Sequence, residues 1–333
     1  MKRNNFFLLL VFIITGLYAC SPTSPKLQPM PDFSNQIKSE NNNVFRRPKV
    51  DILFIVDDSG SMSTHQKNLS NNIELFVDEF SKLKLIDYHI GVISTSENDN
   101  GELRGVPKYV EAKTFNGLNI LKSNVILGTS GSATEMVFAP LVRALSSKNQ
   151  LGANAGFYRQ SAYLIPIFIT DAEDQSDEAS SKINAEETLD FLFDLKKDKN
   201  KILSFGAIVP SNEVDCSRDA FEKPTRIEEF LSLNINKGNN IVSLCDTQFG
   251  KKLVDFSKAI VNAVNRPIIL AQRPNVQTIR VFFGTQEIFP SFLNGWIYDP
   301  KDNSIKLGKD LTLDENQPPD SAIEVYFDGV ILQ

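Results

Sequence analysis

Two long apolar runs, each ending abruptly in polar residues, stand out in the hydrophobic pattern of the chain. The first, residues 50–56, reads VDILFIV and is followed by Asp57; the second, residues 163–170, reads YLIPIFIT and is followed by Asp171. Aliphatic runs of this length predict strands that are buried on both faces of a sheet. Pro166 fits the second strand poorly, because proline supplies no N–H to a sheet. We therefore expect two central strands that end in acidic residues.

Between and beyond these runs, apolar residues at intervals of three and four alternate with short extended patterns. Amphipathic helices are predicted at residues 63–83, 136–145, 186–195, 226–233 and 249–264, and further strands at 86–94, 109–115, 201–209 and 239–244. This alternation predicts an α/β fold, in which helices flank a mostly parallel central sheet. The expected domain spans residues 49–265.

The pattern changes at residue 266, after which short strand-like runs are separated by Pro, Gly, Asn and Asp. No long helical pattern interrupts them. We predict that residues 266–333 form a small β-rich module. Trp296 is expected in the core of this module, because large aromatic side chains mostly serve packing.

Small oxygen-bearing side chains follow the first buried strand at alternate positions: Asp57, Ser59 and Ser61. In an extended turn, these side chains converge on one point. The carboxyl ends of the strands are where open α/β sheets bind ligands, and oxygen donors suit a hard cation such as Mg2+. Capping of the following helix is the alternative role for these residues.

Residues 57–61, Asp-Asp-Ser-Gly-Ser, resemble the Asp-x-Ser-x-Ser signature of the von Willebrand factor type A domain, which carries a metal-ion-dependent adhesion site. The resemblance implies a Rossmann-like fold for the predicted domain. It also implies a further ligand from a threonine in the loop before a helix. We assign this ligand to Thr134, with Thr129 and Ser132 as alternatives; helix capping is a competing role for Thr134.

Asp171, after the second buried strand, matches the second carboxylate of the family site, although Ala172 replaces the usual glycine. The resemblance thus implies a divalent cation, Mg2+ with Ca2+ or Mn2+ as alternatives, held by Asp57, Ser59, Ser61, Thr134 and Asp171. It further implies that an Asp or Glu carboxylate of a protein partner fills the open coordination position. The implied function is adhesion or scaffolding.

Two other functions are open at this point. An assembly factor would engage an ATPase or a chaperone through the same face. A metal-dependent hydrolase would use Asp57, Asp171 and Glu173. However, no His, Lys or second carboxylate cluster is placed as a general base, so we expect no enzymatic activity.

The remaining titratable residues near the motifs are given smaller roles. Glu173, Asp174 and Asp177 are expected to form a solvated acidic rim, as most charge runs do. His65 and His89 are assigned no function, since neither has a Cys or acidic neighbour at metal or triad spacing.

The first nineteen residues have the pattern of a bacterial lipoprotein signal peptide. A basic start precedes an apolar stretch at residues 6–18, and Leu17-Tyr18-Ala19-Cys20 resembles a lipobox, in which the cysteine is lipidated. An ordinary secretory signal or a short membrane anchor is the alternative. Residues 20–48, rich in Pro, Ser and Asn, predict a lipidated Cys20 followed by a flexible tether. We expect a lipid-anchored protein of the bacterial outer membrane, on its periplasmic or surface face.

The net charge and the cysteines limit which partners, metal sites and covalent links we expect. Removal of residues 1–19 leaves 33 basic residues against 41 acidic ones, so the net charge moves from −6 to −8. Such an acidic chain is a poor ligand for nucleic acid. Cys216 and Cys245, the cysteines besides Cys20, lack the spacing of a zinc site. In an exported protein we expect them to form a disulfide, with two free thiols as the alternative.

Overall fold

The computed structural model describes residues 37–38, 45–81, 85–132, 134–178, 182–213, 223–314, 316–318 and 321–329. All of them belong to one compact unit, Gln36–Gln333. Within these ranges, no helix combines the length and the apolar character that a membrane span requires. Cys20 and Cys216 lie outside the described residues, so the predicted lipidation and the predicted bond to Cys245 stay predictions.

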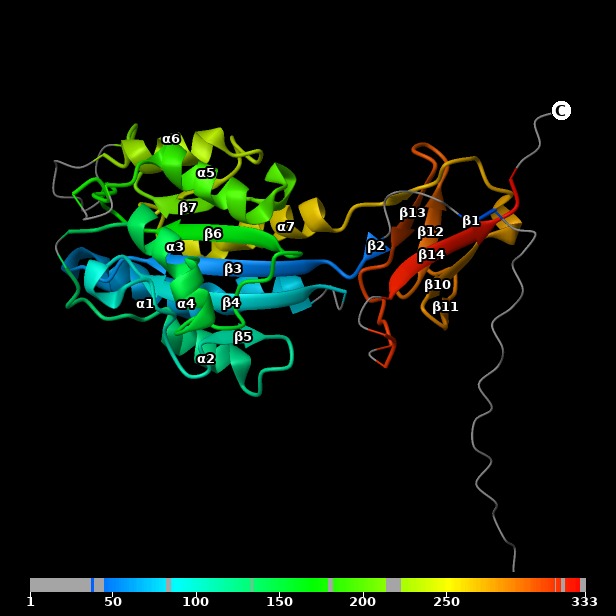
Figure 1. The fold of residues 1–333 in the computed structure, drawn as a ribbon, viewed down its shortest axis with the longest axis horizontal. Helices are drawn as coiled ribbons and strands as arrows, with labels where there is room; N and C mark the ends of the chain where they lie inside the picture. Colours follow the sequence, from blue (N-terminus) through cyan, green and yellow to red (C-terminus); the bar gives the residue numbers. More distant parts are fainter. Residues whose placement is uncertain are drawn as a thin grey trace, which may run out of the picture. The chain divides into compact units, whose positions relative to one another are not determined.

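A six-stranded sheet with the order β5-β4-β3-β6-β7-β8 forms the first part of the fold (Figure 1). Its strands are β3 (Lys49–Val56), β4 (Asp87–Ser94), β5 (Tyr109–Glu111), β6 (Tyr163–Ile169), β7 (Phe205–Ile208) and β8 (Ile241–Ser243). Only the edge strand β5 runs antiparallel to its neighbour. The predicted α/β architecture with a mostly parallel central sheet is therefore confirmed.

Seven α-helices of this part lie among the described residues: α1 (Ser63–Ser81), α2 (Gly117–Asn124), α3 (Phe138–Ala144), α4 (Ser147–Leu151), α5 (Ala185–Lys196), α6 (Thr225–Leu233) and α7 (Phe249–Val264). Short 3-10 turns are η1 (Gly60–Met62), η2 (Glu97–Asp99) and η3 (Lys199–Lys201). Neither α2, with eight residues, nor α4, with five, was predicted.

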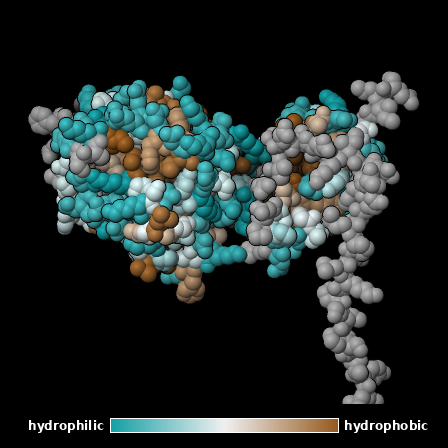
Figure 2. Space-filling view, viewed as in Figure 1, coloured by the Kyte–Doolittle hydropathy of each residue, from teal (hydrophilic) through white to brown (hydrophobic). Residues whose placement is uncertain are grey.

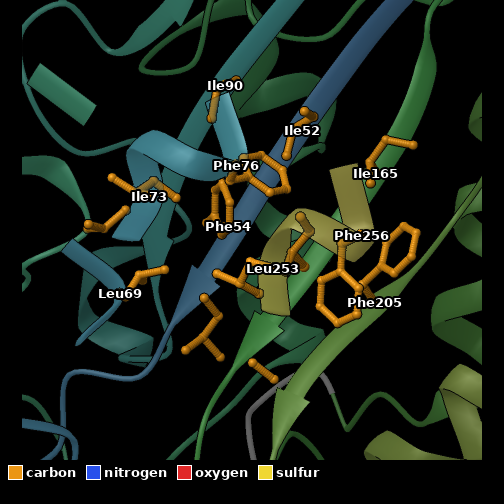
Figure 3. Close-up of a cluster of buried hydrophobic side chains, with 14 of the residues drawn as sticks. Ile52, Phe54, Leu69, Ile73, Phe76, Ile90, Ile165, Phe205, Leu253 and Phe256 are labelled. Atoms are coloured by element: carbon orange, nitrogen blue, oxygen red, sulfur yellow. The ribbon is translucent and has the colours of Figure 1, made fainter. Parts of the chain in front are cut away.

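The two faces of the sheet bury separate hydrophobic clusters, and β3 contributes to both. Its residues Ile52 and Phe54 face α1 and α7, whereas Leu53 and Ile55 face α3, α5 and α6. Figure 3 shows the first cluster, in which Phe54 meets Phe76 of α1 edge-on at 5.4 Å between ring centroids. Burial on both faces explains why β3 reads as a continuous apolar run.

Pro166 lies inside the sheet, in β6, opposite Leu53 of β3. The paired residues of β6 and β7 begin at Ile167 and Phe205, one position after the proline. Pro166 thus falls between this ladder and the isolated Leu164–Ile202 bridge, so no residue of β7 is paired with the proline.

The predicted β-rich module is also confirmed. One of its sheets has the order β1-β14-β10-β11 with β2 added on β14, and the other has the order β12-β13-β9. Its elements are β1 (Ile37–Lys38), β2 (Phe45–Arg46), β9 (Ile268–Ile269), η4 (Val276–Thr278), β10 (Arg280–Phe283), β11 (Gln286–Ile288), β12 (Trp296–Asp299), β13 (Ser304–Leu307) and β14 (Ala322–Phe327). Trp296 is buried, as predicted, and its Nε1 donates to the Ile288 carbonyl at 2.7 Å.

The segment before the α/β domain differs from the sequence-based expectation. Residues 20–48 were predicted as a flexible tether, yet Ile37–Lys38 and Phe45–Arg46 pair antiparallel with β14. Strands of two residues show no hydrophobic alternation, so the sequence pattern could not reveal them. The β-rich module is consequently built from residues on both sides of the α/β domain.

Candidate metal site at the carboxyl edge of the sheet

The candidate site lies where β3, β4 and β6 end together. Asp57 follows β3 directly, and its backbone N–H donates to the Ile169 carbonyl of β6 at 2.9 Å. On the other side, the Thr95 N–H donates to the Val56 carbonyl at 3.2 Å. Asp57 is thus fixed between two neighbouring strands at the edge where open α/β sheets bind ligands.

Hydrogen bonds join four of the five predicted ligands into one group, which we call the carboxyl-edge cluster: Asp57, Ser59, Ser61 and Asp171. Asp57 Oδ1 accepts from the Ser59 N–H at 2.8 Å. The hydroxyls of Ser59 and Ser61 share a hydrogen bond at 3.0 Å, and Ser61 Oγ donates to Asp171 Oδ1 at 3.0 Å. Residues 110 positions apart in the chain are therefore brought together as predicted.

Two residues that sequence reasoning missed hold Asp57 in place. Thr170 Oγ1 donates to Asp57 Oδ2 at 2.6 Å. Gln66 Nε2 donates to the Asp57 carbonyl at 2.7 Å and to the Gly128 carbonyl at 2.8 Å. A signal for Gln66 was present, because it interrupts the apolar stripe that continues through Leu69 and Ile73 of α1. A buried polar side chain in such a stripe needs a partner.

Thr134 is not linked to the carboxyl-edge cluster through its side chain among the described residues. Its backbone N–H donates to Ser132 Oγ at 3.0 Å, and the Ser132 N–H donates to Ser96 Oγ at 3.1 Å. Thr129, one of the alternatives, is exposed to solvent. The choice among Thr134, Ser132 and Thr129 as the fifth ligand therefore stays a prediction.

Asp58 connects the loop of residues 128–134 to the cluster. Its carboxylate accepts from Ser96 Oγ at 3.0 Å, and its carbonyl accepts from the Gly131 N–H at 2.9 Å. A Cβ atom at Gly131 would lie 2.3 Å from Asp58 Cγ, so this approach requires glycine. Burial raises the pKa of Asp58 above its ordinary value. Asp58 therefore positions the loop that carries Thr134.

The electrostatics of the cluster are those of an uncompensated acidic pair. Asp57 is fully buried and Asp171 is 7% exposed. Burial raises the pKa of Asp57, and the charge of Asp171 adds to this, whereas hydrogen bonds from Thr170 and Ser59 oppose it. In the part of the chain that the structure describes, no Lys or Arg forms an ion pair with either carboxylate. A buried carboxylate without a counter-charge is costly.

The donor set fits a hard divalent cation. Two carboxylates and two hydroxyls already converge in the carboxyl-edge cluster, and a bound cation would supply the missing positive charge. Among the described residues, no group of three or more His, Cys, Asp or Glu side chains could hold a metal. The site is therefore rich in hydroxyl and carboxylate oxygens, which suit Mg2+ better than Zn2+.

His65 lies close enough to the cluster to sense its charge, although the sequence analysis gave it no role. Burial lowers the pKa of His65, while the charges of Asp171 and Asp57 oppose this shift. Its ring packs against Phe249 of α7 at 6.0 Å between centroids. His65 is therefore a neighbour of the site that no sequence spacing revealed.

The expectation of a solvated acidic rim is wrong for Asp174, and Glu173 is only half-buried. Glu173 accepts hydrogen bonds from Thr225 Oγ1 at 2.6 Å and from the Arg226 N–H, at the first turn of α6. Asp174 is 1% exposed. Only Asp177 has a largely exposed side chain, and it pairs with Arg226 at 3.2 Å.

Asp174 instead ties the loop after β6 to the first turn of α3. Its Oδ1 accepts from the Val137 N–H at 2.7 Å and the Phe138 N–H at 3.1 Å, and its Oδ2 pairs with Arg226 at 3.1 Å. Ser176 Oγ accepts from the Ala139 N–H at 2.9 Å. Unpaired N–H groups at the start of a helix need such acceptors. The segment that follows Thr134 is thereby attached to the segment that follows Asp171.

Comparisons with known proteins give fold-level similarity only. No family model matches the chain, and no curated protein is significantly similar to it. A solved von Willebrand factor type A protein from Catenulispora acidiphila is 12% identical with a TM-score of 0.42, covering 85% of this chain and 57% of that one. Proximal thread matrix protein 1 from the mussel byssus is 12% identical with a TM-score of 0.41, covering 68% of this chain and 49% of that one.

The pilus adhesin SpaC of Lactobacillus rhamnosus GG, in an open conformation, is 13% identical with a TM-score of 0.40, covering 88% of this chain and 42% of that one. The chain thus spans about half the length of these solved structures. The site residues, rather than these similarities, carry the functional proposal.

Proposed function

We propose that the protein binds a protein partner through a divalent cation held at the carboxyl edge of its central sheet. Asp57, Ser59, Ser61 and Asp171 would hold the cation, with Thr134 as the fifth ligand. The observation that carries the proposal is the buried pair of Asp57 and Asp171, which lacks a cationic partner among the described residues and is hydrogen-bonded to two serines. A cation at this point would relieve the repulsion between the two carboxylates.

The residues around the cluster support this role by holding the donors still. Thr170 and the Ser59 N–H orient the Asp57 carboxylate, and Gln66 fixes its backbone. When bound, the cation would supply a Lewis-acidic position for a carboxylate of the partner. Neutral hydroxyl ligands leave a cation electrophilic, so an Asp or Glu side chain is the matching group. Mg2+ is the proposed ion, with Ca2+ and Mn2+ as alternatives.

A hydrolase that uses Asp57, Asp171 and Glu173 is the less favoured candidate. The Glu173 carboxylate accepts hydrogen bonds from Thr225 Oγ1 and from the Arg226 N–H, so it is already engaged at the start of α6. A general base needs a free acceptor within reach of the substrate. We therefore propose a binding protein and not an enzyme.

The setting that we propose is a bacterial lipoprotein, anchored through Cys20 to the outer membrane. Adhesion or scaffolding is the proposed use of the cation site. An assembly factor that engages an ATPase or a chaperone through the same site is the second candidate, and the identity of a captured partner distinguishes the two.

The test is capture of partners from solubilised envelopes with and without cation. The wild-type chain should retain a partner in Mg2+ and release it in EDTA, whereas Asp57→Ala should retain none. Asp255→Asn, at an exposed position on α7, is the matched control and should behave as wild type. A partner that stays bound both in EDTA and to Asp57→Ala would contradict the proposal.

A further inference from the structure

The loop between β11 and β12, residues 289–295, exposes large apolar side chains to solvent; we call it the apolar loop. Phe289 is 69% exposed, Phe292 is 75% exposed and Leu293 is 42% exposed. On the face drawn in Figure 2, most of the described surface is hydrophilic, with hydrophobic residues as interruptions. Exposed apolar residues that gather on one loop commonly mark an interaction site.

Hydrogen bonds at its base hold the apolar loop in one conformation. The Ser291 N–H donates to the Trp296 carbonyl at 3.0 Å, the Gly308 N–H to the Gly295 carbonyl at 2.8 Å, and the Asp310 N–H to the Leu293 carbonyl at 2.8 Å. A Cβ atom on Gly295 would lie only 1.9 Å from the Phe289 carbonyl oxygen, so the closure of the loop requires glycine there. The two phenylalanines are thus presented on a preformed turn, which lowers the entropy cost of binding.

The chemistry of the apolar loop matches a lipid surface. The loop carries two exposed aromatic side chains, Phe289 and Phe292, and the run from residue 288 to residue 298 contains no Asp, Glu, Lys or Arg. Charged side chains are costly to bring into a bilayer, whereas aromatic side chains favour the membrane interface. A run without charge is therefore suited to shallow insertion between lipid headgroups.

The path of the chain favours a membrane, rather than a protein, as the binding partner of the apolar loop. Residues 20–36 separate the proposed lipidated Cys20 from Ile37 of β1, which pairs with β14 of the same module. Seventeen residues span at most about 60 Å when fully extended. The module that carries the apolar loop is thus the first part of the described chain that the anchor reaches. An anchor at Cys20 would therefore present the bilayer to the apolar loop at a high effective concentration.

We propose that the apolar loop docks the β-rich module onto the phospholipid bilayer by inserting Phe289 and Phe292. This inference rests on the lipid anchor in the proposed function, but not on the cation site. Docking would hold the β-rich module against the bilayer surface.

Vesicle flotation of an unlipidated chain tests the proposal without help from the anchor. The Cys20→Ser chain, residues 20–333, is mixed in EDTA with vesicles of phosphatidylethanolamine and phosphatidylglycerol. The parent chain should float with the vesicles, and Phe289→Ser/Phe292→Ser should lower the partition coefficient by at least about tenfold. Phe115→Ser, which removes a phenylalanine that is 94% exposed in the α/β domain, is the matched control and should float like the parent.

A second readout reports insertion itself. Phe292→Trp adds a tryptophan beside the buried Trp296, the chain's only native one. Brominated phospholipid should quench the added fluorescence, and Phe115→Trp should not be quenched. A parent chain that does not float, or a Phe115→Ser loss equal to that of the double variant, would overturn the proposal. Asp57→Asn should float normally, so failure of the cation site and failure of docking are distinguishable.

Discussion

Two fully buried aspartates lie at opposite ends of strand β3: Asp51 near its amino end and Asp57 just past its carboxyl end. The two carboxylates differ in the charge of the groups around them. Asp51 accepts from Arg159 twice, from Nε at 2.8 Å and from the backbone N–H at 2.6 Å. Arg159 also pairs with Asp87 of β4 at 2.7 Å. Asp57, in contrast, receives only neutral donors, the Thr170 hydroxyl and the Ser59 N–H.

This difference separates a carboxylate that is neutralised within the fold from one that we propose as a metal ligand. Burial raises the pKa of both aspartates, but the charge of Arg159 opposes the shift at Asp51. At Asp57, the charge of Asp171 adds to the shift. The amino end of the sheet is thus neutralised from within the chain. At the carboxyl end, no Lys or Arg of the described residues pairs with Asp57 or Asp171, and a cation from solution could supply that charge.

The largest effect is expected from removing the internal counter-charge. Arg159→Met removes the guanidinium charge from Asp51 and Asp87 and leaves Asp51 only the backbone N–H of residue 159, so it should lower the free energy of unfolding by about 3–5 kcal/mol. Urea unfolding measures this change, with Arg273→Met at an exposed position as the control. A loss below about 1 kcal/mol would mean that solvent, rather than Arg159, compensates these carboxylates.

The next effect concerns Lys196, which donates to the Arg159 carbonyl at 2.8 Å. Burial lowers the pKa of Lys196 from 10.5 to about 8. Between these values the unfolded chain holds a proton that the folded chain has released, so the free energy of unfolding rises with pH. Relative to Lys196→Met, the free energy of unfolding of the wild type should rise by up to about 3 kcal/mol between pH 8 and 10.5.

Urea unfolding at several pH values measures this gain, with Lys251→Met at an exposed position of α7 as the control. The control should follow the wild type across the interval. A pH dependence that is the same in Lys196→Met and in wild type would show that Lys196 is not the titrating group.

A smaller effect is expected at Asp174, which joins the loop after β6 to the start of α3. Asp174→Ala leaves the Val137 and Phe138 N–H groups and part of Arg226 unpaired, so it should cost about 2 kcal/mol of stability. If Thr134 is a ligand, Mg2+ affinity should fall as well, because this junction holds the segment after Thr134. Asp177→Ala, at the exposed partner of Arg226, is the control. Equal losses of stability in Asp174→Ala and Asp177→Ala would show that the buried carboxylate contributes no more than the exposed one.

The central strands and all four residues of the carboxyl-edge cluster were predictable because their signals are local. A continuous apolar run identifies a buried strand, and the residues after it must lie at the strand's end. Asp57, Ser59 and Ser61 are neighbours in sequence. Asp171 follows the second such run, so two local patterns sufficed to bring it to the same edge.

The supporting residues were not predictable because their partners are distant in the chain. Thr170 contacts Asp57 across 113 positions, and Asp174 contacts Val137 across 37. Asp174 belongs to a charge run that is typical of a solvated surface, and only the packing of α3 against the loop reverses that expectation. The two-residue strands β1 and β2 exist only through their pairing with β14.

The most direct test of the central claim is a Mg2+ titration of unfolding stability in wild type and Asp57→Asn. A cation that binds only the folded chain should raise the free energy of unfolding of the wild type by about 2.7 kcal/mol at a hundred times its Kd. In EDTA, Asp57→Asn should be at least as stable as wild type, because it removes a buried charge without a partner, and Mg2+ should not stabilise it further. An equal response of both chains to Mg2+, or no response of the wild type, would contradict the account.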